Sequence, residues 1–95
     1  MRYNVKRMSL SESDAYQRLQ QAARGIDPPL VVDRGSVHWL DGPYPGVSFG
    51  LALGEAHALL FMPAADIAEP GWEQRLPTRL ESAHGYLLSF TRPAR

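Results

Sequence analysis

Apolar residues recur at steps of three and four along residues 11–24, the spacing that gathers side chains on one face of a helix. Ser9 precedes Glu12 by three residues, as in a capping box, and an acidic residue suits the first turn of a helix. Gly25 and the pair Pro28-Pro29 end the pattern. The sequence therefore predicts one amphipathic helix, whose apolar stripe is Ala15, Tyr16, Leu19, Ala22, Ala23 and Ile26.

The pattern changes to a period of two after the prolines, which is typical of strands. Alternation is strictest between Val47 and Leu53, where large apolar residues alternate with small ones. Gly54 supplies a turn, and a second run from Ala56 to Met62 is apolar enough to be a central strand. Together the two runs predict a β-hairpin over residues 46–62.

Shorter segments complete the predicted sheet. The segment 63–77 contains three prolines and a glycine, so we expect a long loop there with at most one helical turn. Strand character is found at residues 2–8, at 30–32 and 37–40 around a tight turn at 33–36, and at 86–90, paired with 79–81. The expected fold class is α+β, with one N-terminal amphipathic helix packed on a mostly antiparallel sheet of five or six strands. The 95 residues form a single domain, 1–95, because half that length could not bury enough surface alone.

The composition narrows the chemistry and the compartment. The absence of cysteine excludes disulfides, cysteine-based zinc binding and thiol catalysis, and favours a reducing, cytoplasmic compartment. The first eight residues lack the apolar core of a signal peptide. The longest apolar run, Ala56 to Ala65, contains His57 and Pro63 and is too short to span a membrane. We therefore expect a cytoplasmic protein without a membrane segment.

A net charge of zero hides a segregated distribution of charge. Residues 35–74 contain no Lys or Arg, and their five acidic residues are Asp41, Glu55, Asp66, Glu69 and Glu73. All ten basic residues lie outside this segment. If folding mixes the two sets on the surface, the segregation has no consequence; if not, it marks an acidic surface.

The sequence gives little support to a catalytic or metal-binding function. His38, His57 and His84 come from three separate predicted elements, and no two are at the spacing of metal ligands. The serines lack the glycine elbow that activates a nucleophile. We expect no catalytic residue, no metal and no cofactor, with His38 and His57, which lie in apolar strand contexts, as hydrogen-bonded core or interface histidines.

A protein partner fits the remaining features better than a nucleic acid. Basic residues near the N-terminus and on the helix could contact phosphates. Proteins that bind nucleic acid, however, usually have a clearly positive net charge, whereas the net charge here is zero. Aromatic residues in acidic, proline-rich loops are typical of protein interfaces. We expect the partner to contact the 41–46 and 63–73 loops, with Trp72 as the anchor, although Trp72 could equally fill the core. The predicted partner-binding residues are Asp41, Tyr44, Asp66, Glu69, Trp72 and Glu73.

The stretch from Leu40 to Phe61 resembles a bacterial immunity protein of the family that neighbours polymorphic toxins, often of the deaminase superfamily. The similarity lies in a strand, a proline turn, an apolar strand containing Ser48-Phe49-Gly50-Leu51, a short glycine turn and another apolar strand. It implies an N-terminal helix followed by a sheet, and a role in neutralising a toxin. An acidic surface would suit such an inhibitor, because toxins that act on nucleic acid present basic clefts.

The sequence thus predicts a non-enzymatic protein-binding module, most concretely an immunity protein or inhibitor whose partner is a basic-cleft toxin or nucleic-acid enzyme. Two alternatives stay open. The first is a small phage or accessory factor that binds a nucleic-acid enzyme or nucleic acid itself. The second is a small enzyme or ligand-binding domain that uses His38 or His57.

Overall fold

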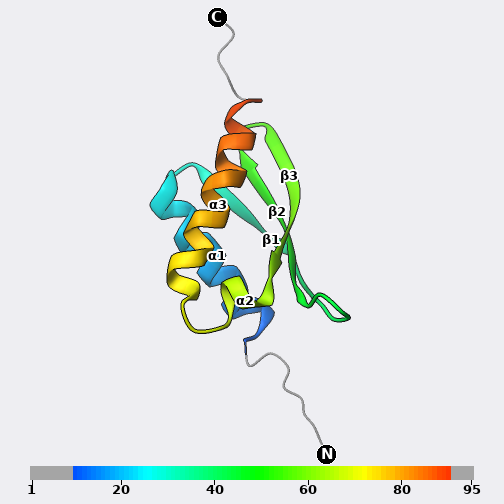
Figure 1. Cartoon of the computed structure of the whole chain (residues 1–95). Coiled ribbons are helices and arrows are strands. Elements are labelled where there is room, and N and C mark those ends of the chain that lie inside the picture. Colours follow the sequence, from blue (N-terminus) through cyan, green and yellow to red (C-terminus); the bar gives the residue numbers. More distant parts are fainter. Residues whose placement is uncertain (1–9, 91–95) are drawn as a thin grey trace, which may run out of the picture.

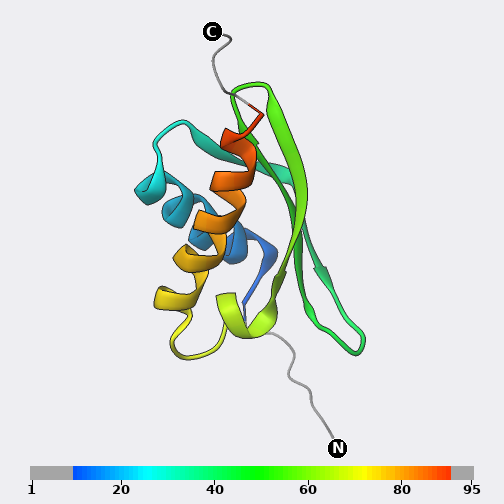
Figure 2. The same ribbon diagram turned by 45° about the horizontal axis from the view of Figure 1, so that its top comes forward.

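The computed structural model describes residues 10–90 and contains three helices and three strands in that part of the chain. Two helices, α1 and α3, pack on one face of an antiparallel sheet with strand order β1-β2-β3 (Figure 1). Short α2 follows β3 at one end of the sheet (Figure 2). In chain order the elements are α1 (Glu12–Ile26), β1 (Leu30–Leu40), β2 (Gly46–Leu53), β3 (Ala56–Pro63), α2 (Ala64–Ile67) and α3 (Trp72–Leu88).

The N-terminal helix and the central hairpin are confirmed. The predicted stripe of α1 lies against the sheet and α3, with Leu19 fully buried. Ser11 is the N-cap, and its hydroxyl oxygen accepts a hydrogen bond of 3.0 Å from the Asp14 N–H. Strands β2 and β3 pair without a gap from Gly46↔Pro63 to Leu53↔Ala56. The predicted capping box at Ser9 falls outside the described residues, as does the strand 2–8.

The sheet of five or six strands was wrong, because residues 10–90 contain only three strands. The predicted strand 79–81 and most of the predicted strand 86–90 lie in α3 instead, which ends at Leu88. Leu76, Leu80 and Leu87 are buried along one face of this helix. A short apolar run such as 86–90 can have the same composition in a strand and in a buried helix. Only the spacing of its apolar residues could distinguish the two.

The loop predicted over residues 63–77 was also wrong in most of its length. Only residues 68–71 separate α2 from α3. Pro77 lies inside α3, in its second turn, where it removes one helical hydrogen bond. The helix continues past it because its buried leucines pack on the sheet and on α1, and tertiary packing overrides local propensity.

Strand β1 is continuous where a hairpin was expected at 33–36. The register moves from Asp33↔Gly50 to His38↔Ser48, so five steps along β1 match two along β2. The intervening residues bulge out of the strand. Within the bulge the Ser36 hydroxyl donates to the Asp33 carbonyl oxygen and accepts from the Gly50 N–H, both at 2.6 Å. The turn residues thus make a local turn, as their chemistry indicates, without reversing the chain.

The two faces of the sheet differ in side-chain size. On the face covered by the helices, β2 contributes the buried residues Val47, Phe49, Leu51 and Leu53. On the other face the same strand contributes small residues, namely Gly46, Ser48, Gly50 and Ala52. Since no helix of the described chain covers this second face, which we call the outer face, the small residues form the floor of a shallow trough along β2.

Candidate protein-binding site

The structure brings together the two stretches that the sequence singled out for partner binding. A hollow of about 400 Å³ lies between the loop after β1 and the end of β3 with α2. The Ala64 N–H donates a hydrogen bond of 3.0 Å to the Pro45 carbonyl oxygen, which ties one wall to the other. We call this the proline hollow, and its lining residues are Pro43, Tyr44, Pro45, Phe61, Pro63, Ala64, Ala65 and Glu69.

Local sequence explains the shape of the proline hollow. Pro43 and Pro45 restrict the backbone on both sides of Tyr44, so the loop keeps one shape. The Phe61 ring covers Gly46, where a Cβ atom would lie only 2.5 Å from the Phe61 Cζ. Glycine at position 46 therefore allows the aromatic ring to form the floor. Glu69 is the only charged residue of the lining, and it is exposed.

Tyr44 is the most exposed large hydrophobic side chain of the described residues, with 81% of its surface accessible. Phe61 is 43% exposed beside it. Aromatic side chains left this open on a stiff support are the residues that contribute most when a protein partner covers them. Of the predicted site residues, Tyr44 and Glu69 line the proline hollow, and Asp41 lies exposed in the same loop.

Asp66 has a different environment from the one that the sequence led us to expect. It is 6% exposed and forms ion pairs with Arg75 at 3.1 Å and with Arg79 at 2.8 Å. Arg75 also donates to the carbonyl oxygens of Ala65 and Pro70, at 2.5 and 2.8 Å. The Asp66 carboxylate therefore holds α2 against α3 and does not present its charge to solvent.

Trp72 lies at the start of α3 and is half-buried against the core. The Arg18 guanidinium stacks on its ring, 4.0 Å from the ring centre. Arg18 also donates a hydrogen bond of 2.7 Å to the Ile67 carbonyl oxygen. A separate hollow of about 200 Å³ lies here, with Glu73 in its wall, so Trp72 and Glu73 do not join the proline hollow.

The acidic segment does not form one negative surface. Asp66 is neutralised by two arginines. Glu55 lies in the β2–β3 turn, at the opposite end of the hairpin from Asp41. Glu69 and Glu73 are exposed at different hollows. Folding thus disperses most of the charge that is segregated along the sequence.

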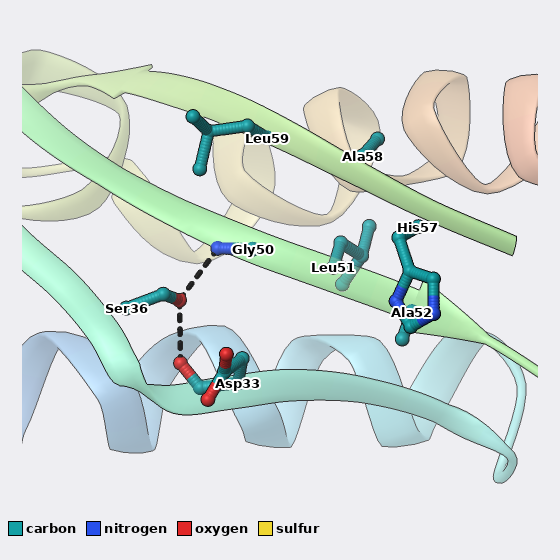
Figure 3. A pocket seen from close by; sticks show the side chains of 8 residues that line it. All are labelled: Asp33, Ser36, Gly50, Leu51, Ala52, His57, Ala58 and Leu59. Carbon is teal, nitrogen blue, oxygen red and sulfur yellow. Dashed lines mark hydrogen bonds between the residues drawn. The ribbon is translucent and has the colours of Figure 1, made fainter.

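The outer face of the sheet carries a further shallow hollow, of about 280 Å³ (Figure 3). Ser36 and His57 both line it but lie toward opposite ends, with Gly50 and Leu51 between them in the view. The Ser36 hydroxyl is already bonded to Gly50 and Asp33. The hollow therefore lacks a serine positioned next to a histidine base, the arrangement that a serine–histidine nucleophile needs.

The three histidines lie in separate places. His84 Nε2 is 2.8 Å from Asp27 Oδ2 and links α3 to the end of α1. His38 Nδ1 is 3.9 Å from Glu12 Oε2, and His57 is exposed on the outer face. Over residues 10–90 no three histidine, aspartate or glutamate side chains gather closely enough to hold a metal ion.

Sequence reasoning missed Phe61 as part of the site; Pro63 and the alanines of α2 fall within the 63–73 segment that it expected there, but it named none of them. It treated β3 as a central strand, whereas β3 is an edge strand of the sheet formed by residues 10–90, with one exposed face. The signal was in the neighbouring strand: residues as small as Ser48 and Gly50 leave open space beside Phe61 and Leu59.

Comparisons with protein-family models, with curated proteins and with solved structures found no match for this chain. None of the helices in the described chain has the length and apolarity that crossing a bilayer requires. Fold and site together define a small α+β domain whose most accessible aromatic side chain stands on a proline-stiffened loop at the rim of an apolar hollow.

Proposed function

We propose that this domain is a non-enzymatic protein-binding module, and most concretely an immunity protein or inhibitor that docks on a cognate toxin or enzyme through the proline hollow. The observation that carries the proposal is Tyr44, 81% exposed between two prolines. Keeping a large aromatic ring in water forgoes the hydrophobic gain of burial, which a partner recovers when it covers the ring. The stiff loop reduces the ordering entropy that binding costs.

The chemistry of the hollow defines the partner's contact. Proline, alanine and aromatic walls accept an apolar side chain, and Glu69 at the rim favours a neighbouring Lys or Arg. This pattern also suits a toxin with a basic cleft. The binding energy comes from the apolar centre, because exposed rim charges mainly alter the association rate.

The experiment begins with affinity purification of the partner from the source cells, followed by calorimetric titration of the purified partner. Tyr44→Ala should weaken binding at least tenfold, since a buried interface aromatic contributes about 2 kcal/mol. Glu69→Lys should slow association in a salt-dependent way. Tyr86→Ala is the matched control, because Tyr86 is 56% exposed but lies near the end of α3 and does not line the proline hollow.

A second arm tests the inhibitor role. If the partner is a toxin, co-expression of the wild-type domain should protect cells, and Tyr44→Ala should protect them less while Tyr86→Ala does not differ. Equal affinity of the Tyr44→Ala variant would refute the docking site. Tight binding of random DNA or RNA with a steep salt slope would favour the nucleic-acid alternative instead.

A further inference from the structure

Within residues 10–90, the two edges of the sheet differ in whether other elements cover their backbone hydrogen-bonding groups. Side chains of α1 close the β1 edge: the Gln20 side chain accepts from the Val32 N–H at 2.9 Å and donates to the Leu30 carbonyl oxygen at 3.4 Å. Glu12 accepts from the Trp39 N–H at 2.9 Å. Hydrogen-bonding groups that would otherwise attract another strand are therefore occupied along β1.

Edge strand β3 has no such cover within residues 10–90. It is the other edge of the sheet, and none of the hydrogen bonds found outside the helices and the ladder reaches residues 56–62. The alternation of an antiparallel ladder identifies which groups point outward. The Gly50 N–H points toward β1, so Phe49 and Leu51 point toward β3 and bond to their partners Leu60 and Ala58. The outward-facing backbone groups of β3 are therefore those of His57, Leu59 and Phe61.

The strand also lacks the features that prevent pairing at exposed edges. Residues 56–65 contain no Lys, Arg, Asp or Glu. The β2–β3 register is continuous, so no bulge twists β3 away, and its one proline is the last residue, Pro63. Leu59 is 78% exposed in the middle of the strand. An uncharged, regular and apolar edge of this kind is a template for another strand.

We infer that a second copy of this chain covers the β3 edge, through antiparallel pairing of β3 with itself. If a two-fold axis passes between the two Leu59 residues, Leu59 lies opposite Leu59 of the second copy and His57 lies opposite its Phe61. The outward-facing backbone groups of all three residues can then form hydrogen bonds between the two chains. Such an interface is self-complementary by symmetry. It joins two three-stranded sheets into one continuous sheet of six strands.

Side chains are complementary in this register. On the outer face, Leu59 meets Leu59 of the second copy on the axis. On the inner face, the small Ala58 lies opposite Leu60, beside a hollow of about 340 Å³ between β3 and α3 that the neighbouring copy would help to close. Because β3 is uncharged, no like charges lie opposite each other between the two paired strands.

The contact is large enough for a specific dimer. Eight residues of antiparallel strand extend about 27 Å. The sheet and the helix layer behind it give a depth of about 20 Å, so the dimer buries on the order of 1,100 Å² in total, near the lower limit for specific interfaces. The inference is independent of the proposed function, since its test measures self-association.

The first test is sedimentation velocity of the full chain over a range of concentrations. We expect a dimer of twice the 10.6 kDa chain mass. Leu59→Pro removes an outward N–H that the internal ladder does not use, and proline is tolerated on an edge strand in that position. This variant, and Leu59→Lys, should keep the circular-dichroism spectrum and raise the dimer dissociation constant about tenfold or more.

The second test uses the natural absence of cysteine. Leu59→Cys should form a disulfide between chains on oxidation, because paired Cα atoms on the axis lie about 5.5 Å apart. His57→Cys is the matched control on the same strand and face, since the two His57 residues would be about 15 Å apart and beyond disulfide reach.

Three outcomes would overturn the inference. One is a wild-type chain that stays monomeric at every concentration. Another is a dimer unaffected by both Leu59 variants, or cross-linked as readily through His57→Cys as through Leu59→Cys. The third is a monomer whose Leu59 amide is protected from hydrogen exchange, which would assign the edge to another segment of the same chain.

Discussion

Asp66 lies in α2, whose first residues line the proline hollow, and Tyr44 lies in the loop that lines the hollow from the other side; the fold uses the two residues in opposite ways. The Asp66 cluster, which consists of Asp66, Arg75 and Arg79, is internally satisfied, because each oxygen of the buried carboxylate faces an arginine. Tyr44 has no hydrogen bond or ring contact from the described residues and is 81% exposed. Both belong to the same acidic, proline-rich part of the sequence. The difference teaches that a charged residue in such a segment can maintain the scaffold while a neutral one remains available for a partner.

Of the substitutions that test this comparison, a substitution of Asp66 should have the largest effect on the free energy of unfolding. Asp66→Ala leaves Arg75 and Arg79 without their carboxylate and loosens α2 from α3. Breaking a buried pair can cost several kcal/mol, but both arginines are more than a third exposed and can turn to water, so we expect a loss of about 2 kcal/mol in the free energy of unfolding. Urea denaturation measures this loss.

Glu69→Ala is the matched control for that experiment, because Glu69 lies three residues away and its side chain is exposed. It should change the free energy of unfolding by less than about 0.5 kcal/mol. Equal effects of the two substitutions would mean that the Asp66 cluster does not hold the scaffold.

Trp72 tests whether the start of α3 belongs to the scaffold or to an interface. The ring packs on the core and under Arg18, so Trp72→Ala should lower the free energy of unfolding by roughly 2 kcal/mol, toward the low end for a large aromatic because Trp72 is only half-buried. The partner's affinity, corrected for unfolded protein, should stay the same. A folded variant with normal stability and lost affinity would restore Trp72 as the interface anchor that the sequence indicated.

Arg18 and Trp72 should also be coupled to each other. A double-mutant cycle with Arg18→Met and Trp72→Leu should give an interaction energy of about 0.5–1 kcal/mol, the usual range for a partly exposed cation–π pair. Denaturation of the four proteins measures it. Additive effects would show that Arg18 acts only through its hydrogen bond to the Ile67 carbonyl oxygen.

The sequence predicted the elements whose pattern extends over many residues. The stripe of α1 and the alternation of β2 required no knowledge of the rest of the chain, and both are confirmed. Helix α3 was missed because Pro77 breaks the local signal, while the buried faces of Leu76 and Leu80 are evident only once the sheet is in place.

The site was harder to predict for a similar reason. Proximity of the 41–46 loop to residues 63–69 follows from the hairpin, and the sequence placed both in one site. Whether an acidic side chain is free depends on arginines from α3, a region predicted as loop and strand. The sequence therefore indicated the location of the hollow but could not distinguish Asp66, which is structural, from Tyr44, which is exposed.

Tyr44 should give the smallest effect on stability, and that small effect is the sharpest test of its role. The side chain buries little surface in the isolated domain, and its two flanking prolines already fix the loop. Tyr44→Ala should therefore change the free energy of unfolding by less than about 0.5 kcal/mol in urea denaturation. Gly46→Ala provides the contrast, because a Cβ atom there would collide with the Phe61 ring and destabilise the same end of the sheet. A destabilisation of more than about 1 kcal/mol by Tyr44→Ala would show that the ring supports the fold, and the reason for assigning it to a partner would be lost.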